Sequence, residues 1–160
     1  MQVENDGRND FDFLVGNFIM RHRRLKERLK GCTEWEEFDG TATGKKILNG
    51  RGHMDEVIIN RSTGYNYGCT VRLFDVNSRQ WSIYWSAGTS NVLDTPMIGG
   101  FKDGVGEFYS QEAFEGRHIF CGFTWSKITA NSAQWEQAFS IDGGKTWEVN
   151  WMNTFERVGE

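Results

Sequence analysis

The chain of 160 residues is long enough for one domain with a sizeable core, and its formal net charge is −4. This acidic balance argues against a general nucleic-acid-binding protein, and apolar runs of only a few residues argue against a membrane span. We expect residues 1–10, which are polar and lack an apolar signal core, to form a flexible tail before a single domain over residues 11–160.

The three cysteines, Cys32, Cys69 and Cys121, are widely spaced and form no paired motif. An odd number of cysteines without such a motif indicates free thiols rather than a disulfide framework. We therefore expect a soluble cytoplasmic protein.

The composition favours β structure. Aromatic residues make up 14% of the chain, and there are 19 glycines but one proline. Aromatic and β-branched residues suit strands, while glycines mark the turns between them. Most apolar residues alternate with polar ones, which is the pattern of an antiparallel sheet with two unlike faces.

The first predicted hairpin spans residues 11–40, where a basic run precedes an acidic run. Its first strand begins near Phe13 and continues past His22, although residues 25–29 also fit a short helical turn. Alternation places the following side chains on one face of this strand: Phe18, Met20, His22 and Arg24. A turn at residues 31–33 leads into the acidic strand, which covers residues 34–43.

Ion pairs are expected across this hairpin. With the turn centred on Gly31, Lys26 faces Glu36 or its neighbour, and Arg28 faces Glu34. Each such pair stabilises a sheet by roughly 0.2–1 kcal/mol.

A second interpretation of the basic run is an anion site. His22 and Arg24 share the face of Phe18. If that face points into a barrel, these two side chains could hold a carboxylate or phosphate of a ligand.

Eight further strands are predicted, separated by turns rich in Gly, Asn or Asp. They cover residues 47–60, 67–76, 80–87, 97–101, 106–114, 117–127, 134–140 and 147–157. Gly50 and Gly52 interrupt the first of them and predict a bulge or bend. About ten strands joined mostly by hairpins favour an all-β fold, a single up-and-down antiparallel β-barrel, and a barrel of this size can enclose one small ligand.

The last hairpin loop contains a recognisable turn motif. It has the form Ser-x-Asp-x-Gly-x-Thr-Trp, carried by Ser140, Asp142, Gly144, Thr146 and Trp147. This pattern matches the Asp-box of sialidases and other β proteins, where it is a folding motif. The carboxylate accepts backbone N–H groups, the glycine takes a positive φ and the tryptophan packs under the turn. A single copy without repeats does not predict a propeller.

Several stretches together resemble a known family. They are FDFLVGNF, HRRLKERL, GCTEWEEFDGT, VRLFDVNSRQWSIYWS, GEFY and WEQAFSIDGGKTWEVNW. They are similar to a family of uncharacterised small bacterial proteins described as calycin-like barrels, distant relatives of lipocalins and fatty-acid-binding proteins. The resemblance covers nearly the whole chain. It implies a closed antiparallel barrel around a cavity and no established reaction.

The resemblance also implies a plug at the base of the barrel. In lipocalins the aromatic residue of a Gly-x-Trp step seals the base beneath an arginine from the last strand. Gly16 and Phe18 occupy that step here, and Arg157 or Arg61 is the expected covering cation.

Candidate ligand-binding residues follow from the strand faces. His22 and Arg24 share the face of Phe18, and the other candidates lie on strands whose same-face neighbours are mixed rather than purely apolar. Together the candidates are His22, Arg24, Arg72, Trp85 and Trp125. Aromatic walls with a few convergent polar groups are the usual lining of a small-molecule site.

No residue set commits the chain to a reaction or a cofactor. There is no Gly-x-Ser-x-Gly motif, and Cys121 has the surroundings of a core residue. His53 and Asp55 could supply two metal ligands, but no second pair appears, so no metal is predicted. The related nitrobindin barrels bind haem through a histidine in the C-terminal part of the chain, whereas the last histidine here is His118, so no haem is predicted.

Three functional hypotheses remain. The leading one is a binding protein for a small hydrophobic or amphipathic molecule, with an anionic group as an option, and with no nucleic-acid or membrane partner. The second is an enzyme that uses His22 or a pocket carboxylate in acid–base chemistry, and it is the less favoured. Its candidate carboxylates are Glu37, Glu107, Glu112 and Glu136. The third is a structural or homodimeric barrel with a filled interior.

Overall fold

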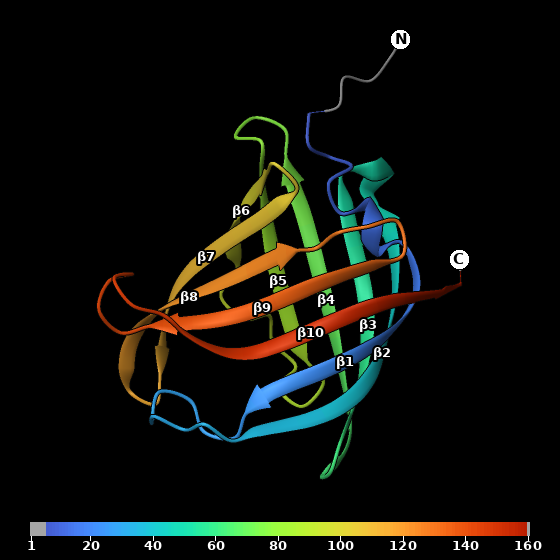
Figure 1. Ribbon diagram of the computed structural model, residues 1–160. Helices are drawn as coiled ribbons and strands as arrows, with labels where there is room; N and C mark the ends of the chain where they lie inside the picture. The colour runs from blue at the N-terminus through green and yellow to red at the C-terminus, as the bar shows by residue number, and fades with distance from the viewer. Residues whose placement is uncertain (1–5, 160) are drawn as a thin grey trace.

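The computed structural model describes residues 6–159 as a closed barrel of antiparallel strands, which confirms the predicted all-β, up-and-down fold. Its strands are β1 (Gly16–Leu25), β2 (Trp35–Ile47), β3 (Gly52–Arg61), β4 (Gly64–Asp75), β5 (Gln80–Ala87), β6 (Met97–Lys102), β7 (Val105–Phe114), β8 (Arg117–Ser126), β9 (Ser132–Ser140) and β10 (Glu148–Gly159). Each strand pairs with the next in the chain, and β10 returns to pair with β1 (Figure 1).

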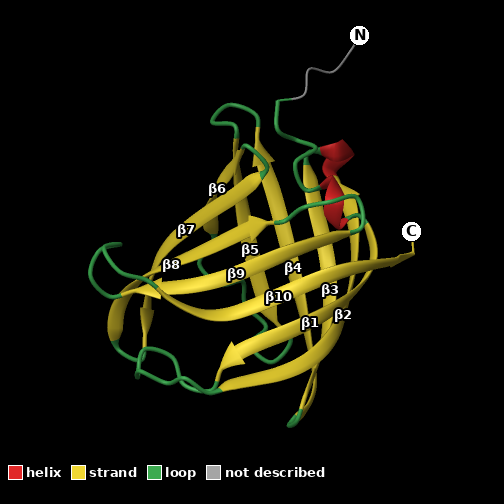
Figure 2. Ribbon diagram, viewed as in Figure 1, coloured by secondary structure: helices red, strands yellow, loops and turns green. Residues whose placement is uncertain are grey.

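Two short 3-10 helices, η1 (Asp12–Leu14) and η2 (Leu48–Gly50), lie at the same end of the barrel (Figure 2). We call this end the base and the opposite end the mouth. Within residues 6–159, no helix is long and apolar enough to cross a membrane.

The segment before β1 is a helical turn, so the prediction of a strand from Phe13 is wrong for its first residues. Phe11 and Leu14 have helical spacing and both are buried, and Gly16 turns the chain into β1 with a φ of 120°. The Phe11 ring lies 4.9 Å from the Trp81 ring and packs edge-on against it. This aromatic contact closes the base from inside the barrel.

The predicted tail over residues 1–10 falls partly outside the described residues, which begin at residue 6. Residues 6–10 form turns against the base. The Gly7 carbonyl accepts a hydrogen bond of 3.2 Å from Trp81 Nε1.

Arg157 and Phe18 lie together at the base. The Arg157 guanidinium carbon is 4.7 Å from the centre of the buried Phe18 ring. The guanidinium also donates hydrogen bonds to the backbone carbonyls of Val15 and Phe13, the latter at 3.2 Å. Of the two cations considered for this role, Arg61 instead packs over Phe38, at 5.3 Å.

The first hairpin places its acids beside its bases, but not in the predicted register. Arg24 lies opposite Glu36, and Lys26 forms an ion pair of 3.5 Å with Glu34. The predicted partners of Lys26 and Arg28 are therefore wrong by two residues. The ladder ends at Leu25, and an irregular loop with φ of 61° at Leu29 replaces a tight turn centred on Gly31. Residues 25–29 form no helix.

The structure shows two further breaks in the strands, of which only the first was predicted. The predicted strand over residues 47–60 is divided, because η2 joins β2 to β3 and Asn49 in it has a φ of 53°. In β10, a bulge places Asn150 as an extra residue between the paired Val149 and Trp151, and Asn150 is completely buried.

The loop before β10 is held by side-chain hydrogen bonds. Asp142 Oδ1 accepts from Ser140 Oγ at 2.8 Å and from the Thr146 backbone N–H at 2.9 Å. These bonds, with those of Thr146 the strongest, lower the pKa of Asp142 to about 2. Gly144 has a φ of 92°, and its carbonyl accepts a hydrogen bond from Trp147 Nε1 at 3.1 Å.

The backbone of Gly44 in β2 is tightly packed against its neighbours at the base of the barrel. A Cβ atom at this position would lie 2.1 Å from the Leu14 carbonyl oxygen and 2.8 Å from His53 Nε2. We expect Gly44→Ala to lower the free energy of unfolding by about 2 kcal/mol in urea denaturation, because backbone must move. Gly100→Ala is the matched control, since its nearest neighbour, Arg79 O, is 4.0 Å away. Equal stability of the two variants would contradict this account of the base.

Candidate ligand-binding site inside the barrel

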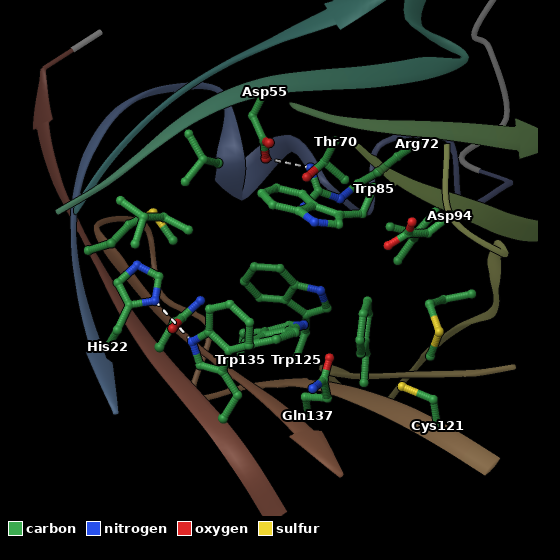
Figure 3. A pocket seen from close by; sticks show the side chains of 18 of the residues that line it. His22, Asp55, Thr70, Arg72, Trp85, Asp94, Cys121, Trp125, Trp135 and Gln137 are labelled. Carbon is green, nitrogen blue, oxygen red and sulfur yellow. Dashed lines mark hydrogen bonds and ion pairs between the residues drawn. The ribbon is translucent and has the colours of Figure 1, made fainter. Parts of the chain in front are cut away.

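The barrel encloses a cavity of about 150 Å³ between the base and the mouth (Figure 3). Its aromatic walls are Trp85, Phe123, Trp125, Trp135, Trp151 and Phe155. Polar atoms reach it from His22, Asp55, Thr70, Arg72, Gln137 and Asn153. Asp94 and Thr95, exposed residues of the β5–β6 loop, also line it, so the cavity reaches the surface on that side. The interior is therefore not completely filled by side chains.

The base end of the cavity carries a buried polar chain. His53 Nε2 donates to the Leu14 carbonyl at 2.9 Å, which leaves His53 Nδ1 as the acceptor of a 3.0 Å bond from Arg72 Nη1. The same Arg72 nitrogen donates to Asp55 Oδ2 at 2.7 Å. The cation between His53 and Asp55 is thus a guanidinium, although the sequence suggested these two residues as a weak metal pair.

Aromatic rings enclose this guanidinium. Its central carbon lies 4.9 Å from the Phe11 ring and 5.8 Å from the Trp125 ring. The side chains of Arg72 and Asp55 are only 6% and 5% exposed. Removing one partner of such a buried pair costs about 3–5 kcal/mol, because the other charge is left uncompensated.

Three polar atoms of this cluster have no hydrogen-bond partner among the described residues. They are Asp55 Oδ1, Arg72 Nε and Trp125 Nε1, and all three are buried. Leaving a buried donor or acceptor unpaired costs about 1–3 kcal/mol. Because their residues line the cavity, a bound molecule with suitable polar atoms can relieve this cost.

His22 lies further toward the mouth on β1. Its ring stacks on Phe38 with 4.7 Å between ring centres, and Gly40 leaves room beside it, since a Cβ there would lie 3.2 Å from His22 Nε2. His22 Nδ1 accepts a hydrogen bond of 3.1 Å from Trp151 Nε1, so the proton of the neutral ring is on Nε2. Neither nitrogen then has a free lone pair, which makes His22 a poor general base.

Four of the five predicted ligand-binding residues line this one cavity, namely His22, Arg72, Trp85 and Trp125. The Trp85 ring packs against Gly68 of β4, where a Cβ atom would lie 2.0 Å from it. Arg24 is not on the lining. Its guanidinium carbon lies 5.2 Å from the ring of Trp151, whose ring does line the cavity.

No local pattern of the sequence predicts that Asp55 pairs with Arg72. The two residues lie on neighbouring strands, where His53 is directly opposite Arg72 and Asp55 is two residues along. Of the candidate carboxylates, Glu112 lines the cavity and accepts a 2.6 Å bond from Ser110 Oγ, while Glu37 and Glu107 are exposed.

Comparisons with known proteins support the fold. No family model and no curated protein matches the sequence. Among solved structures, the S-type phycobiliprotein lyase CPES from Guillardia theta matches with a TM-score of 0.63 and 12% identity, over 100% of this chain and 99% of that one. At this identity the likeness shows a shared barrel fold and assigns no ligand to this chain.

We expect the protein to lose stability in mild acid, because two of its histidines, His22 and His53, are buried. Burial lowers the pKa of His22 to about 4, and burial together with the Arg72 cation lowers that of His53 to about 4, from an ordinary value of 6.5. Between these values the unfolded chain binds protons that the folded chain does not. The contribution of each histidine to the free energy of unfolding is therefore fully present above pH 6.5. It decreases as the pH falls toward 4, by up to about 3 kcal/mol per histidine.

Urea denaturation at several pH values measures the slope of the free energy of unfolding against pH. His22→Gln and His53→Gln should each remove roughly half of it, whatever their effect on stability at neutral pH. A slope that neither variant changes would show that other groups cause the acid sensitivity.

Proposed function

We propose that this protein binds a small, mostly apolar aromatic molecule inside the barrel, with a polar group of that molecule anchored at Asp55, Arg72 and Trp125. The supporting observation is an aromatic cavity in which three buried polar atoms of these residues lack hydrogen-bond partners. Such a combination of apolar walls and few convergent polar groups is typical of small-molecule sites.

The size of the cavity limits the ligand. A cavity of about 150 Å³ is suited to one ring or two fused rings. The solved structure described above is, by its title, a phycobiliprotein lyase. A linear tetrapyrrole is much larger than this cavity and would require the aromatic walls to move, so we treat it as a comparison ligand.

The charges near the base favour an uncharged polar group. The cation of Arg72 is already balanced by Asp55 at 2.7 Å, and the two leave one donor, Arg72 Nε, and one acceptor, Asp55 Oδ1, unpaired. A lactam or carboxamide offers both an acceptor and a donor, whereas a lone carboxylate would be repelled by Asp55. The amphipathic ligand with an anionic group therefore needs a second site for that group.

A reducing, cytoplasmic setting is part of this proposal. All three cysteines, Cys32, Cys69 and Cys121, are free. Burial strongly raises the pKa of the Cys121 thiol, so this cavity-lining residue is kept as an unreactive thiol.

A pair of ligands of equal shape tests the site. We expect 2-quinolinone, a lactam, to bind about tenfold more tightly than naphthalene in calorimetric titration, because only the lactam can pair with the unpaired atoms. Trp125→Phe removes one of the donors and should reduce this preference severalfold. Biliverdin serves as the comparison ligand.

Trp147→Phe is the matched control, because Trp147 lies in the loop before β10 and its Nε1 donates to the Gly144 carbonyl. It should leave the preference for the lactam unchanged. If neither bicyclic compound binds, or if native mass spectrometry and titration show binding of biliverdin alone, the proposal is wrong.

A further inference from the structure

Two arginines lie at the mouth of the barrel, and both are packed on aromatic rings. Arg24 is on the inward face of β1, with its guanidinium carbon 5.2 Å from the Trp151 ring. Arg28 is on the β1–β2 loop, with its guanidinium carbon 4.7 Å from the Phe114 ring and 5.4 Å from the Phe139 ring. Both side chains are half-buried.

Within residues 6–159, neither guanidinium forms an ion pair with a carboxylate, because the nearby acids have other partners. Glu36 pairs with Arg61 at 2.6 Å. Glu115 pairs with Lys30 at 3.8 Å, and Glu148 accepts the Leu29 backbone N–H at 2.8 Å. In addition, Arg24 Nε is buried without a hydrogen-bond partner.

Burial and neighbouring positive charge both disfavour the charged form of Arg24. Burial, with repulsion from Arg28 and Arg61, lowers the pKa of Arg24 to about 10, and burial lowers the pKa of Arg28. A positive charge that is partly removed from water is unfavourable unless an anion pairs with it. Guanidinium groups are well suited to that anion, because they offer parallel N–H donors to carboxylate and phosphate.

We propose that Arg24 and Arg28 together bind one anionic group, a carboxylate or a phosphate, of a ligand whose ring occupies the barrel. This inference rests on the proposed function and adds the chemical class of the ligand, an aromatic acid or aromatic phosphate. Trp151 connects the two sites, because one face of it carries Arg24 and its ring also lines the cavity.

The β1–β2 loop is fastened in a position that keeps Arg28 at the mouth. Leu29 packs against the core, its N–H is bonded to Glu148, and Lys30 is paired with Glu115. The anion site therefore requires little ordering of the chain when a ligand binds, which favours affinity.

The competing ligand class is a cation, because Asp94 and Glu112 also line the cavity beside aromatic rings. However, Glu112 already accepts a hydrogen bond from Ser110 at 2.6 Å, and Asp94 is exposed in a loop. The unpaired arginines therefore favour the anion, and the cation is one outcome of the test.

Four indoles separate these classes: indole, indole-3-acetate, indoxyl phosphate and tryptamine, titrated against the full chain by calorimetry. We expect at least one of the two anions to bind about tenfold more tightly than indole, a difference of about 1.4 kcal/mol. In the variant R24Q/R28Q this preference should disappear, while the affinity for indole changes by no more than about twofold. The single variant R28Q, which alters only the loop, should lose part of the preference and covers the case in which the double variant does not fold.

The matched control is R21Q/R23Q, which removes two charges from the outer face of the same strand, where they pair with Asp39 and Glu37. It should keep the preference for the anion. If anions bind no more tightly than indole, if tryptamine binds most tightly, or if the control loses the preference equally, the inference fails and the proposed function stands. If no indole and neither bicyclic compound of the earlier test binds, both fail. The carboxylate and phosphate ligands show which anion the site prefers.

Discussion

Closure of the sheet is the constraint on which the structure depends. Because β1 pairs with both β2 and β10, the barrel has no free strand edge, and the inward faces of all its strands must share one interior. The base half of that interior is filled by rings packed around Phe11, including Trp81 and Phe108. The cavity is the part of the same interior that these rings do not fill, so the core and the candidate site are parts of one packing arrangement.

The sequence predicted the strands and the faces better than it predicted the contacts between them. Alternation in β1 placed His22 on the inward face, because side-chain direction in a strand depends only on parity. The register of the first hairpin was wrong by two residues, because it depends on how the loop around Leu29 bends. The pairing of Asp55 with Arg72 was missed for a related reason, since it joins two strands and no local pattern encodes it.

The arginines show how far the partner of a side chain determines its role. Arg157 covers Phe18 and donates to backbone carbonyls, which makes it part of the closed base. Arg72 is more deeply buried and faces a carboxylate, and so it forms a neutral pair in the cavity. Arg24 packs on an aromatic ring and, within residues 6–159, forms no ion pair, because the opposite Glu36 pairs with Arg61, which leaves the charge of Arg24 available. One residue type thus supplies a structural cap, a buried ion pair and a candidate anion site.

The bulge at Asn150 interrupts the alternation of inward and outward side chains along β10. Asn150 is the extra residue between Val149 and Trp151, so every position after it has the inward or outward direction opposite to the one that unbroken alternation would give. If β10 ran straight with the same number of residues, Trp151 and Arg157 would both turn outward. The bulge therefore sets the direction of the cavity wall and of the cap at the base together, and a deletion or insertion between Trp151 and Arg157 should be tolerated less well than a substitution there.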